Sequence, residues 1–176
     1  MEVELLDIYS LEKSSLLSAI KCADFSEAAA VCLEANDHFK GVTMKVEGDF
    51  SCQFKLKWKA VSPRMKNSRE DMAYTVESGA YCLAMLVVEK LTGLKVTRQS
   101  QKRTGFDYWL GDVGDLGMQN CARLEVSGIL KGNLARINSR LKEKIKQTKK
   151  SDTLDLPAYV VIVEFSQPLI KIKKRC

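Results

Sequence analysis

The amino-acid sequence predicts an α/β fold in which a mixed β-sheet lies between two long helices. Apolar residues recur at helical spacing over residues 68–91 and again over residues 133–150. Residues 158–163 are mostly β-branched, which is typical of a buried strand. The C-terminal two thirds is therefore predicted to run helix, strand, strand, strand, helix, strand, with one long helix on each face of the sheet.

Composition narrows the class of protein. The 176 residues are enough for one ordinary domain, and 45% hydrophobic with 28% charged residues excludes collagen-like, disordered and coiled-coil proteins. No apolar run approaches the roughly 18 residues of a membrane-spanning helix. The acidic start, Met1-Glu2-Val3-Glu4, is unlike a signal peptide, so we expect a cytoplasmic protein that does not associate with membranes. The net charge of +6 favours polyanionic partners.

Several classes of catalytic site are disfavoured by what the sequence lacks. It contains no Gly-rich phosphate loop, no dinucleotide-binding glycine pattern and no nucleophile elbow. The six cysteines form no C-x-x-C pair and are expected to be reduced thiols, most of them in the core. His38 is the single histidine, so a zinc site is disfavoured and any Ser-His-Asp or Cys-His mechanism would depend on that one ring.

The first 67 residues are predicted to be an N-terminal helical and β-hairpin extension. We expect helices over residues 11–21 and from Ser26 as N-cap, followed by alternating strands over 42–47 and 52–58. This extension would act as a lid, a dimerisation element or a docking surface. Residues 68–176 are predicted to be the core domain.

Within this core domain, the first long helix is expected to end at Gly93 and to carry Glu77 beside the small residues 78–80, which would allow close packing on a sheet. Strands are predicted over 94–98, 105–110 and 121–130, with residues 111–119 as a glycine-containing loop. After the second long helix, strands are predicted over 157–165 and 168–173.

Two carboxylates interrupt the apolar pattern of the predicted strands. Asp107 lies between Phe106 and Tyr108, and Glu125 lies between Leu124 and Val126. A carboxylate among large apolar residues is costly unless it is paired or binds a cation. If the two strands are hairpin neighbours, the two acids meet side by side and a hard dication such as Mg²⁺ relieves their repulsion. The interpretation without a metal pairs Asp107 with Arg103 or Arg123, and Glu125 with Arg123 or a lysine of the following helix.

This arrangement resembles the PD-(D/E)xK nuclease superfamily, whose restriction-endonuclease-like core has the order αβββαβ. The resemblance covers roughly residues 68–166. It implies that Asp107 and Glu125 bind the metal, Mg²⁺ or Mn²⁺, and that Glu77 on the first helix completes the site. Ser127 lies where the family has its lysine. The catalytic set that the resemblance implies is thus Asp107, Glu125, Ser127 and a displaced lysine.

The identity of the displaced lysine is left open by the sequence. Lys131 is the first candidate, and Lys102, Lys142 and Lys144 are alternatives. The second long helix is strongly basic, with only Glu143 opposing its positive charges between residues 131 and 150. Such a helix favours contact with a phosphate backbone. The residues predicted to contact nucleic acid are Lys102, Arg103, Arg136, Arg140 and Lys144.

The sequence therefore predicts a metal-dependent nuclease, acting on DNA rather than RNA, which by resemblance would belong to a prokaryotic restriction or defence system. A homodimer or a partner subunit is left open. One alternative is a catalytically inactive protein of the same fold that binds nucleic acid or scaffolds a complex. Another is an unrelated α/β interaction protein in which Asp107, Glu125 and Glu77 have only structural or surface roles.

Overall fold

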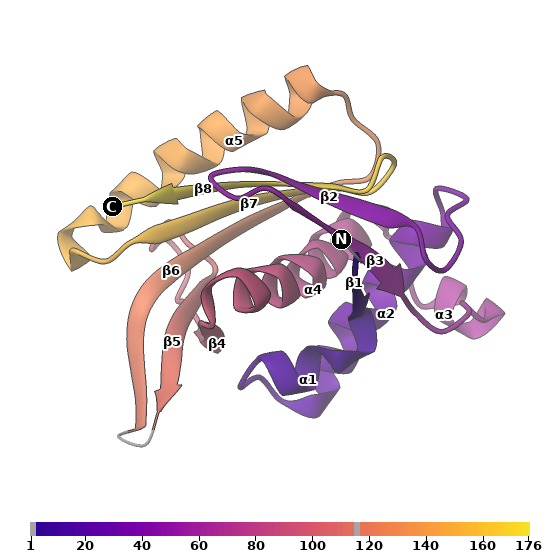
Figure 1. The fold of residues 1–176 in the computed structure, drawn as a ribbon, viewed down its shortest axis with the longest axis horizontal. Coiled ribbons are helices and arrows are strands. Elements are labelled where there is room, and N and C mark those ends of the chain that lie inside the picture. Colours follow the sequence, from indigo (N-terminus) through magenta and orange to yellow (C-terminus); the bar gives the residue numbers. More distant parts are fainter. Residues whose placement is uncertain (1–2, 115–116) are drawn as a thin grey trace.

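The computed structural model describes residues 3–114 and 117–176. Its strands form one mixed eight-stranded sheet in the order β1-β3-β2-β8-β7-β6-β5-β4 (Figure 1). The strands are β1 (Glu4–Asp7), β2 (Thr43–Gly48), β3 (Cys52–Lys57), β4 (Lys95–Gln99), β5 (Tyr108–Gly114), β6 (Gly117–Ile129), β7 (Ala158–Glu164) and β8 (Leu169–Arg175). The helical segments are η1 (Ile8–Ser10), α1 (Leu11–Ser14), α2 (Ala19–Glu34), α3 (Pro63–Asn67), α4 (Met72–Thr92), α5 (Leu134–Thr148) and η2 (Lys149–Leu154).

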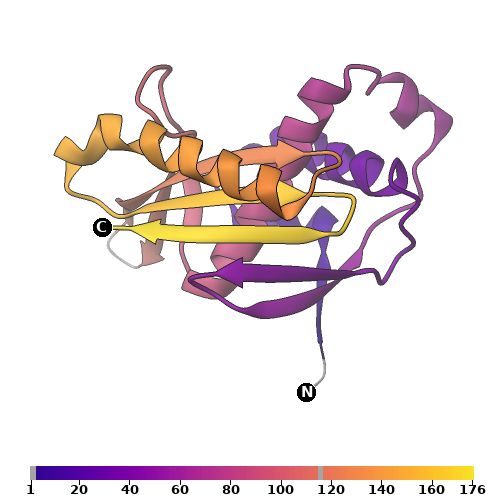
Figure 2. The ribbon, with the colours of Figure 1, turned by 90° about the horizontal axis from the view of Figure 1, so that it is seen from above.

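The two long helices lie on opposite faces of the sheet, so the predicted α/β class with a mixed, helix-flanked sheet is confirmed (Figures 1 and 2). Helix α4 is buried around most of its circumference, because the curved sheet packs on one side of it and α2 on the other. Helix α5 covers β6, β7 and β8 on the other face through Ile137 and Leu141. The rest of α5 is mostly polar and charged, with Leu134 exposed at its start.

The start of α4 differs from the prediction, while its end agrees. The helix begins at Met72, because the Asp71 side chain accepts hydrogen bonds from the backbone N–H groups of Ala73 and Tyr74. The segment before it contains the short helix α3, capped by Ser62. Gly93 ends α4 with a φ of 75°, the left-handed conformation expected of a C-terminal glycine.

Strands β4, β5 and β6 form an antiparallel meander, and α5 connects β6 to the parallel strand β7. The prediction of a loop over residues 111–119 was wrong, because β5 continues to Gly114 and β6 begins at Gly117. Residues 115–116 of that predicted loop lie outside the described residues. Gly111 stays in the ladder at a bulge where a Cβ atom would collide with the Gln119 carbonyl oxygen, so glycine here permits a close crossing of strands.

Residues 3–67 contribute to the same sheet and the same core as the rest of the described chain. Strands β2 and β3 form the predicted hairpin, β1 adds to β3, and β2 pairs in parallel with β8. The buried Arg69 donates to Asp24 and Glu27, which ties the start of the predicted core domain to α2. The hydrophobic core thus passes across the predicted boundary at residue 67 without a gap in packing.

Ser26 is not an N-cap, contrary to the prediction. Helix α2 begins at Ala19, and Ser18 accepts the capping hydrogen bond from the Lys21 N–H. Ser26 lies inside the helix, is buried, and donates its hydroxyl hydrogen bond to the Ile8 carbonyl oxygen. A serine whose side chain satisfies a distant carbonyl gives the same local sequence signal as one that starts a helix.

The small residues of α4 allow close packing, but on two different partners. A Cβ atom on Gly79 would lie 2.9 Å from the Ala29 nitrogen, so Gly79 packs against the backbone of α2 rather than against the sheet. Ala80 does meet the sheet, because its Cβ lies opposite Gly128 of β6. The pair of glycines brings α2, α4 and β6 into direct backbone proximity.

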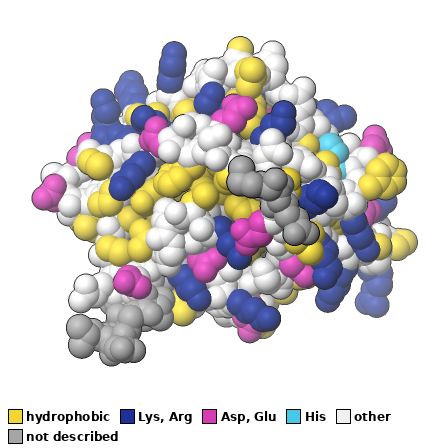
Figure 3. All heavy atoms as spheres, in the orientation of Figure 1, with side chains coloured by type: hydrophobic (Ala, Val, Ile, Leu, Met, Phe, Trp, Pro, Cys, Tyr) yellow, Lys and Arg dark blue, Asp and Glu magenta, His cyan; other side chains and the backbone are white. Residues whose placement is uncertain are grey.

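The surface is uneven in character. On the face seen in Figure 3, hydrophobic side chains gather over one half and Lys and Arg side chains lie around its border. None of the described helices is sufficiently long and apolar to cross a lipid bilayer.

Candidate functional site

Asp107 and Glu125 lie side by side at one end of the β5–β6 ladder. Tyr108 pairs with Leu124, and one step further the Asp107 N–H donates to the Leu124 carbonyl oxygen. The Asp107 side chain turns back to accept the Val126 N–H through Oδ2 at 2.8 Å. This leaves its carboxylate close enough to the Glu125 carboxylate for the two charges to affect each other. The predicted meeting of the two acids follows from the antiparallel pairing of the two strands.

Lys144 of α5 forms an ion pair with Glu125 of this acidic pair. Its Nζ lies 2.6 Å from Glu125 Oε1 and also donates to Gln147 Oε1 at 3.2 Å. The Glu125 side chain is completely buried and that of Lys144 is 19% exposed. Of the four lysines that the sequence left open, Lys144 is therefore the one in contact with a carboxylate of the pair.

The protonation of the pair is strongly perturbed. Burial, followed by the negative charge of Asp107, raises the pKa of Glu125 to about 8, although Lys144 opposes the shift. Burial also raises the pKa of Asp107, against the lowering effect of the Val126 N–H and of Lys144. Glu125 Oε2 is buried and receives no hydrogen bond from any donor in the described part of the chain. The pair therefore binds a proton more tightly than two solvent-exposed carboxylates would.

Glu77 is near this pair but does not join it directly. It is exposed on α4 and accepts a hydrogen bond from the Tyr81 hydroxyl at 3.0 Å. Burial, followed by the negative charges of Asp107 and Glu77, raises the pKa of Tyr81. Tyr81 thus contacts Glu77 and lines the same cavity as Asp107, a position that the sequence analysis did not assign.

Ser127 and Arg140 form a second contact between β6 and α5. The Ser127 hydroxyl is 7% exposed and accepts a hydrogen bond from Arg140 Nη1 at 2.9 Å. Arg140 and Lys144 line a cavity of about 440 Å³ together with Arg136, Glu77 and the backbone at the end of β6. Ser127 therefore contacts a cation of α5 rather than the acidic pair.

A second, smaller cavity lies on the other side of Tyr81. It measures about 280 Å³ and is lined by Lys102 and Arg103 from the β4–β5 loop, by Lys150 and by Asp107. Glu77 and Tyr81 also face it, so Glu77 borders both cavities. All five predicted nucleic-acid contacts thus line one of the two cavities: Arg136, Arg140 and Lys144 the larger one, and Lys102 and Arg103 the smaller one.

Lys131, the first candidate for the displaced lysine, is exposed at the end of β6, and its backbone carbonyl accepts a hydrogen bond from Arg136. Arg123, which the metal-free interpretation pairs with either acid, points elsewhere. It is buried and donates to the Leu156 carbonyl oxygen, to Ser151 and to Asp152. The lysine of the following helix is instead the partner of Glu125.

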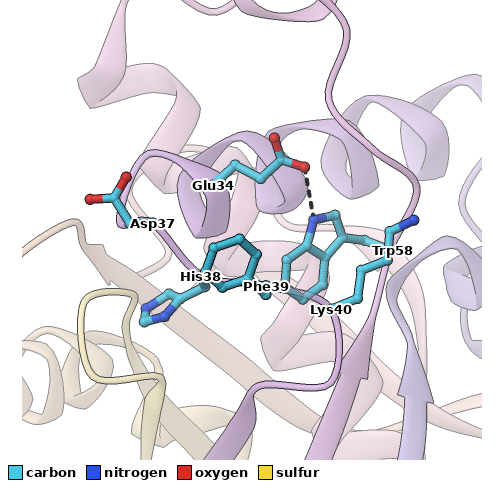
Figure 4. A pocket seen from close by; sticks show the side chains of 6 residues that line it. All are labelled: Glu34, Asp37, His38, Phe39, Lys40 and Trp58. Carbon is cyan, nitrogen blue, oxygen red and sulfur yellow. Dashed lines mark hydrogen bonds between the residues drawn. The ribbon is translucent and has the colours of Figure 1, made fainter.

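The other nucleophiles and the histidine lie in different environments. Burial raises the pKa of both Cys32 and Cys82 to about 12, which makes them poor nucleophiles. His38 borders a separate cavity of about 510 Å³ beside Glu34 and Trp58 (Figure 4). Its Nε2 hydrogen bonds to the Phe165 carbonyl oxygen, and no serine or cysteine side chain bonds to the ring in the described residues.

The acidic pair offers few ligands for a divalent cation. Within residues 3–114 and 117–176, no group of three or more His, Cys, Asp and Glu side chains is arranged to hold a metal ion together. Two carboxylates do lie close together, and the unpartnered Glu125 Oε2 is the kind of oxygen that Mg²⁺ or Mn²⁺ binds. Two protein carboxylates with further water ligands suffice for Mg²⁺, so the residues fit the predicted cofactor.

Comparison with protein families, with curated proteins and with solved structures found no match for this chain.

Proposed function

We propose that this protein is a divalent-metal-dependent nuclease of the PD-(D/E)xK type that hydrolyses DNA. The order of elements supports the proposal, because α4, the β4–β5–β6 meander, α5 and the parallel strand β7 follow the αβββαβ order of that superfamily. The acids also lie at the corresponding places, at the start of β5 and within β6. A place in a restriction or defence system, and a homodimer or partner subunit, belong to the same proposal.

The observation that carries the proposal is the buried set of Asp107, Glu125 and Lys144. A purely structural ion pair needs one carboxylate and one ammonium, whereas here a second carboxylate is held against the first in a low-dielectric setting. The second acid raises the cost of the arrangement and leaves an oxygen without a donor. Such a cost is typical of a site that is kept for a ligand.

Each side chain has a role that its contacts support. Asp107 and Glu125 would hold Mg²⁺, which when bound lowers the pKa of a water molecule and neutralises charge on a phosphoryl oxygen. Lys144 orients Glu125 through a contact of 2.6 Å and takes the place of the motif lysine that Ser127 replaces. Arg140 and Arg136 supply positive charge for the phosphate backbone in the larger cavity.

The second candidate function is DNA binding without hydrolysis. It is favoured by the serine at the motif lysine position and by Glu77, which meets Tyr81 rather than the acidic pair. In that case the positive charges of α5 would bind DNA in a salt-dependent way, and replacing Asp107 or Glu125 would not change the affinity for DNA.

The test is cleavage of labelled single- and double-stranded DNA by the full chain with Mg²⁺, with Mn²⁺ and with a chelator. We expect metal-dependent cleavage that Asp107→Asn and Glu125→Gln each reduce at least about 100-fold. Asp112→Asn is a matched control, because Asp112 is an exposed acid on the same strand β5.

Binding of Mn²⁺ measured by isothermal titration calorimetry separates the two candidates. The nuclease is expected to bind Mn²⁺ at a site lost in both active-site variants and kept in Asp112→Asn. DNA binding that is equal in all four proteins, with neither cleavage nor Mn²⁺ uptake, would establish the non-hydrolytic function instead.

A further inference from the structure

The side chain at the motif lysine position has a partner of its own in this protein. Ser127 Oγ accepts a hydrogen bond from Arg140 Nη1 at 2.9 Å, and the serine is 7% exposed. Its hydroxyl contacts neither carboxylate of the pair among the described hydrogen bonds. A buried serine that receives an arginine can fix the position of that arginine.

This hydrogen bond is one of two side-chain contacts that connect β6 to α5. Glu125 and Ser127 are two residues apart on one face of a strand, which separates them by about 7 Å. Lys144 and Arg140 are four residues apart on one face of a helix, which separates them by about 6 Å. Because the two spacings match, Lys144 meets Glu125 while Arg140 meets Ser127.

Arg140 keeps most of its hydrogen-bonding capacity for a ligand. A guanidinium group has five N–H donors, and Ser127 uses one of them. The nearest acid is Glu143, whose carboxylate lies 3.5 Å from Arg140 Nε and is 70% exposed, so it neutralises little of the charge. The remaining donors border the 440 Å³ cavity, which among its described lining residues contains Arg136 and Lys144 and a single acid, Glu77.

We propose that Ser127 is a positioning residue, which holds the Arg140 guanidinium in the orientation that binds the DNA phosphate next to the one being cleaved. This inference rests on the proposed function, since it names a neighbour of the same site. A free arginine side chain populates many rotamers, and anchoring it beforehand reduces the entropy lost when the phosphate binds. Replacing the motif lysine by serine thus gives the position a new role in binding.

The test measures DNA affinity without metal and cleavage with Mn²⁺ for wild type, Ser127→Ala, Arg140→Ala and the double variant. The affinity probe is a short fluorescent oligonucleotide followed by fluorescence anisotropy in chelator. We expect Ser127→Ala to weaken binding about 3- to 10-fold and Arg140→Ala about 10-fold or more. The double variant should match Arg140→Ala, because Ser127 acts only through that arginine.

Two further variants guard against a general loss of structure. Ser127→Thr keeps the hydroxyl and should bind DNA as wild type does. Arg140→Lys keeps the positive charge on a partly exposed side chain but lacks the planar set of guanidinium N–H donors, so it should bind DNA as weakly as Ser127→Ala. In cleavage, Ser127→Ala should raise KM and leave kcat within about 2-fold, as expected for a group that binds substrate and transition state equally.

The outcomes separate this inference from the nuclease proposal. If wild type cleaves DNA and Ser127→Ala behaves identically, the positioning role is overturned and the nuclease stands. If no protein cleaves but the loss of affinity appears in Ser127→Ala and vanishes in the Arg140→Ala background, the positioning role stands and the nuclease fails. A loss caused by Ser127→Ala that persists in full without Arg140 overturns the positioning role, because the serine then acts by itself.

Discussion

Replacing Glu125 with glutamine should flatten the dependence of folding stability on pH. In the folded protein the pKa of Glu125 is raised to about 8 from its ordinary value of 4.5, chiefly by burial and by Asp107. A group that holds its proton more tightly when folded stabilises the protein fully below about pH 4.5, and this stabilisation is lost as the pH rises through about 8.

The size of the effect follows from the shift. A rise from 4.5 to about 8 corresponds to at most about 5 kcal/mol, shared between Glu125 and its neighbour Asp107. Glutamine has the same shape and cannot ionise, so this part of the pH dependence disappears. Lys144 retains Gln147 as a hydrogen-bond partner in the variant.

The assay is urea unfolding followed by circular dichroism at about pH 5 and about pH 8, in the presence of a chelator. We expect the free energy of unfolding of wild type to fall by several kcal/mol more than that of Glu125→Gln between these two pH values. Glu12→Gln, an exposed acid on α1, is the matched control and should follow wild type. A constant difference between wild type and Glu125→Gln across this range would refute the raised pKa and with it the strained acidic pair.

Four other outcomes are expected. Lys144→Ala should lower the cleavage rate at least about 100-fold while Lys142→Ala, exposed on the same helix, changes it less than about 3-fold, as single-turnover assays would show. Gly79→Ala should lower the free energy of unfolding by about 2 kcal/mol or more, because its Cβ would lie 2.9 Å from the backbone of α2; equal urea midpoints would contradict this. Arg123→Ala should lower the free energy of unfolding by about 3 kcal/mol in the same assay, because the buried carbonyl groups and Ser151 lose the donor of their hydrogen bonds. Arg136→Ala should reduce the slope of log affinity for DNA against log salt by about one phosphate contact, measured by anisotropy over a salt series.

The main elements of the fold could be predicted because their signals are local. The long helices, the β2–β3 hairpin and the β-branched strand β7 each follow from a repeat of apolar residues, and Gly93 ends α4 as expected. The errors occur where a side chain or backbone group has a distant partner. Ser26 bonds to Ile8 rather than to its own helix, and Gly111 continues a strand because Gln119 lies against it.

Some residues of the candidate site could likewise be predicted from the sequence, and others only from the structure. Asp107 and Glu125 stood out because acids within apolar strands are costly, and hairpin pairing then placed them together. Tyr81 carried no signal, since a tyrosine on an apolar helix is ordinary until its hydroxyl is seen to bond to Glu77, beside the cavity that Asp107 also lines. The lysine could have been found by matching the spacing of Arg140 and Lys144 to that of Ser127 and Glu125.

The amino-acid sequence alone thus determined the class of fold, the acidic pair and the basic character of α5. Periodicity, charge and the free-energy cost of burying a carboxylate can each be recognised from the order of the residues. Only tertiary packing decided which lysine meets Glu125 and which cation Ser127 holds. It also decided that the strands before residue 68 belong to the same sheet as those after it. Those contacts depend on how a helix is placed over a sheet, and that placement is set by the summed packing of many residues distant in sequence rather than by any local pattern.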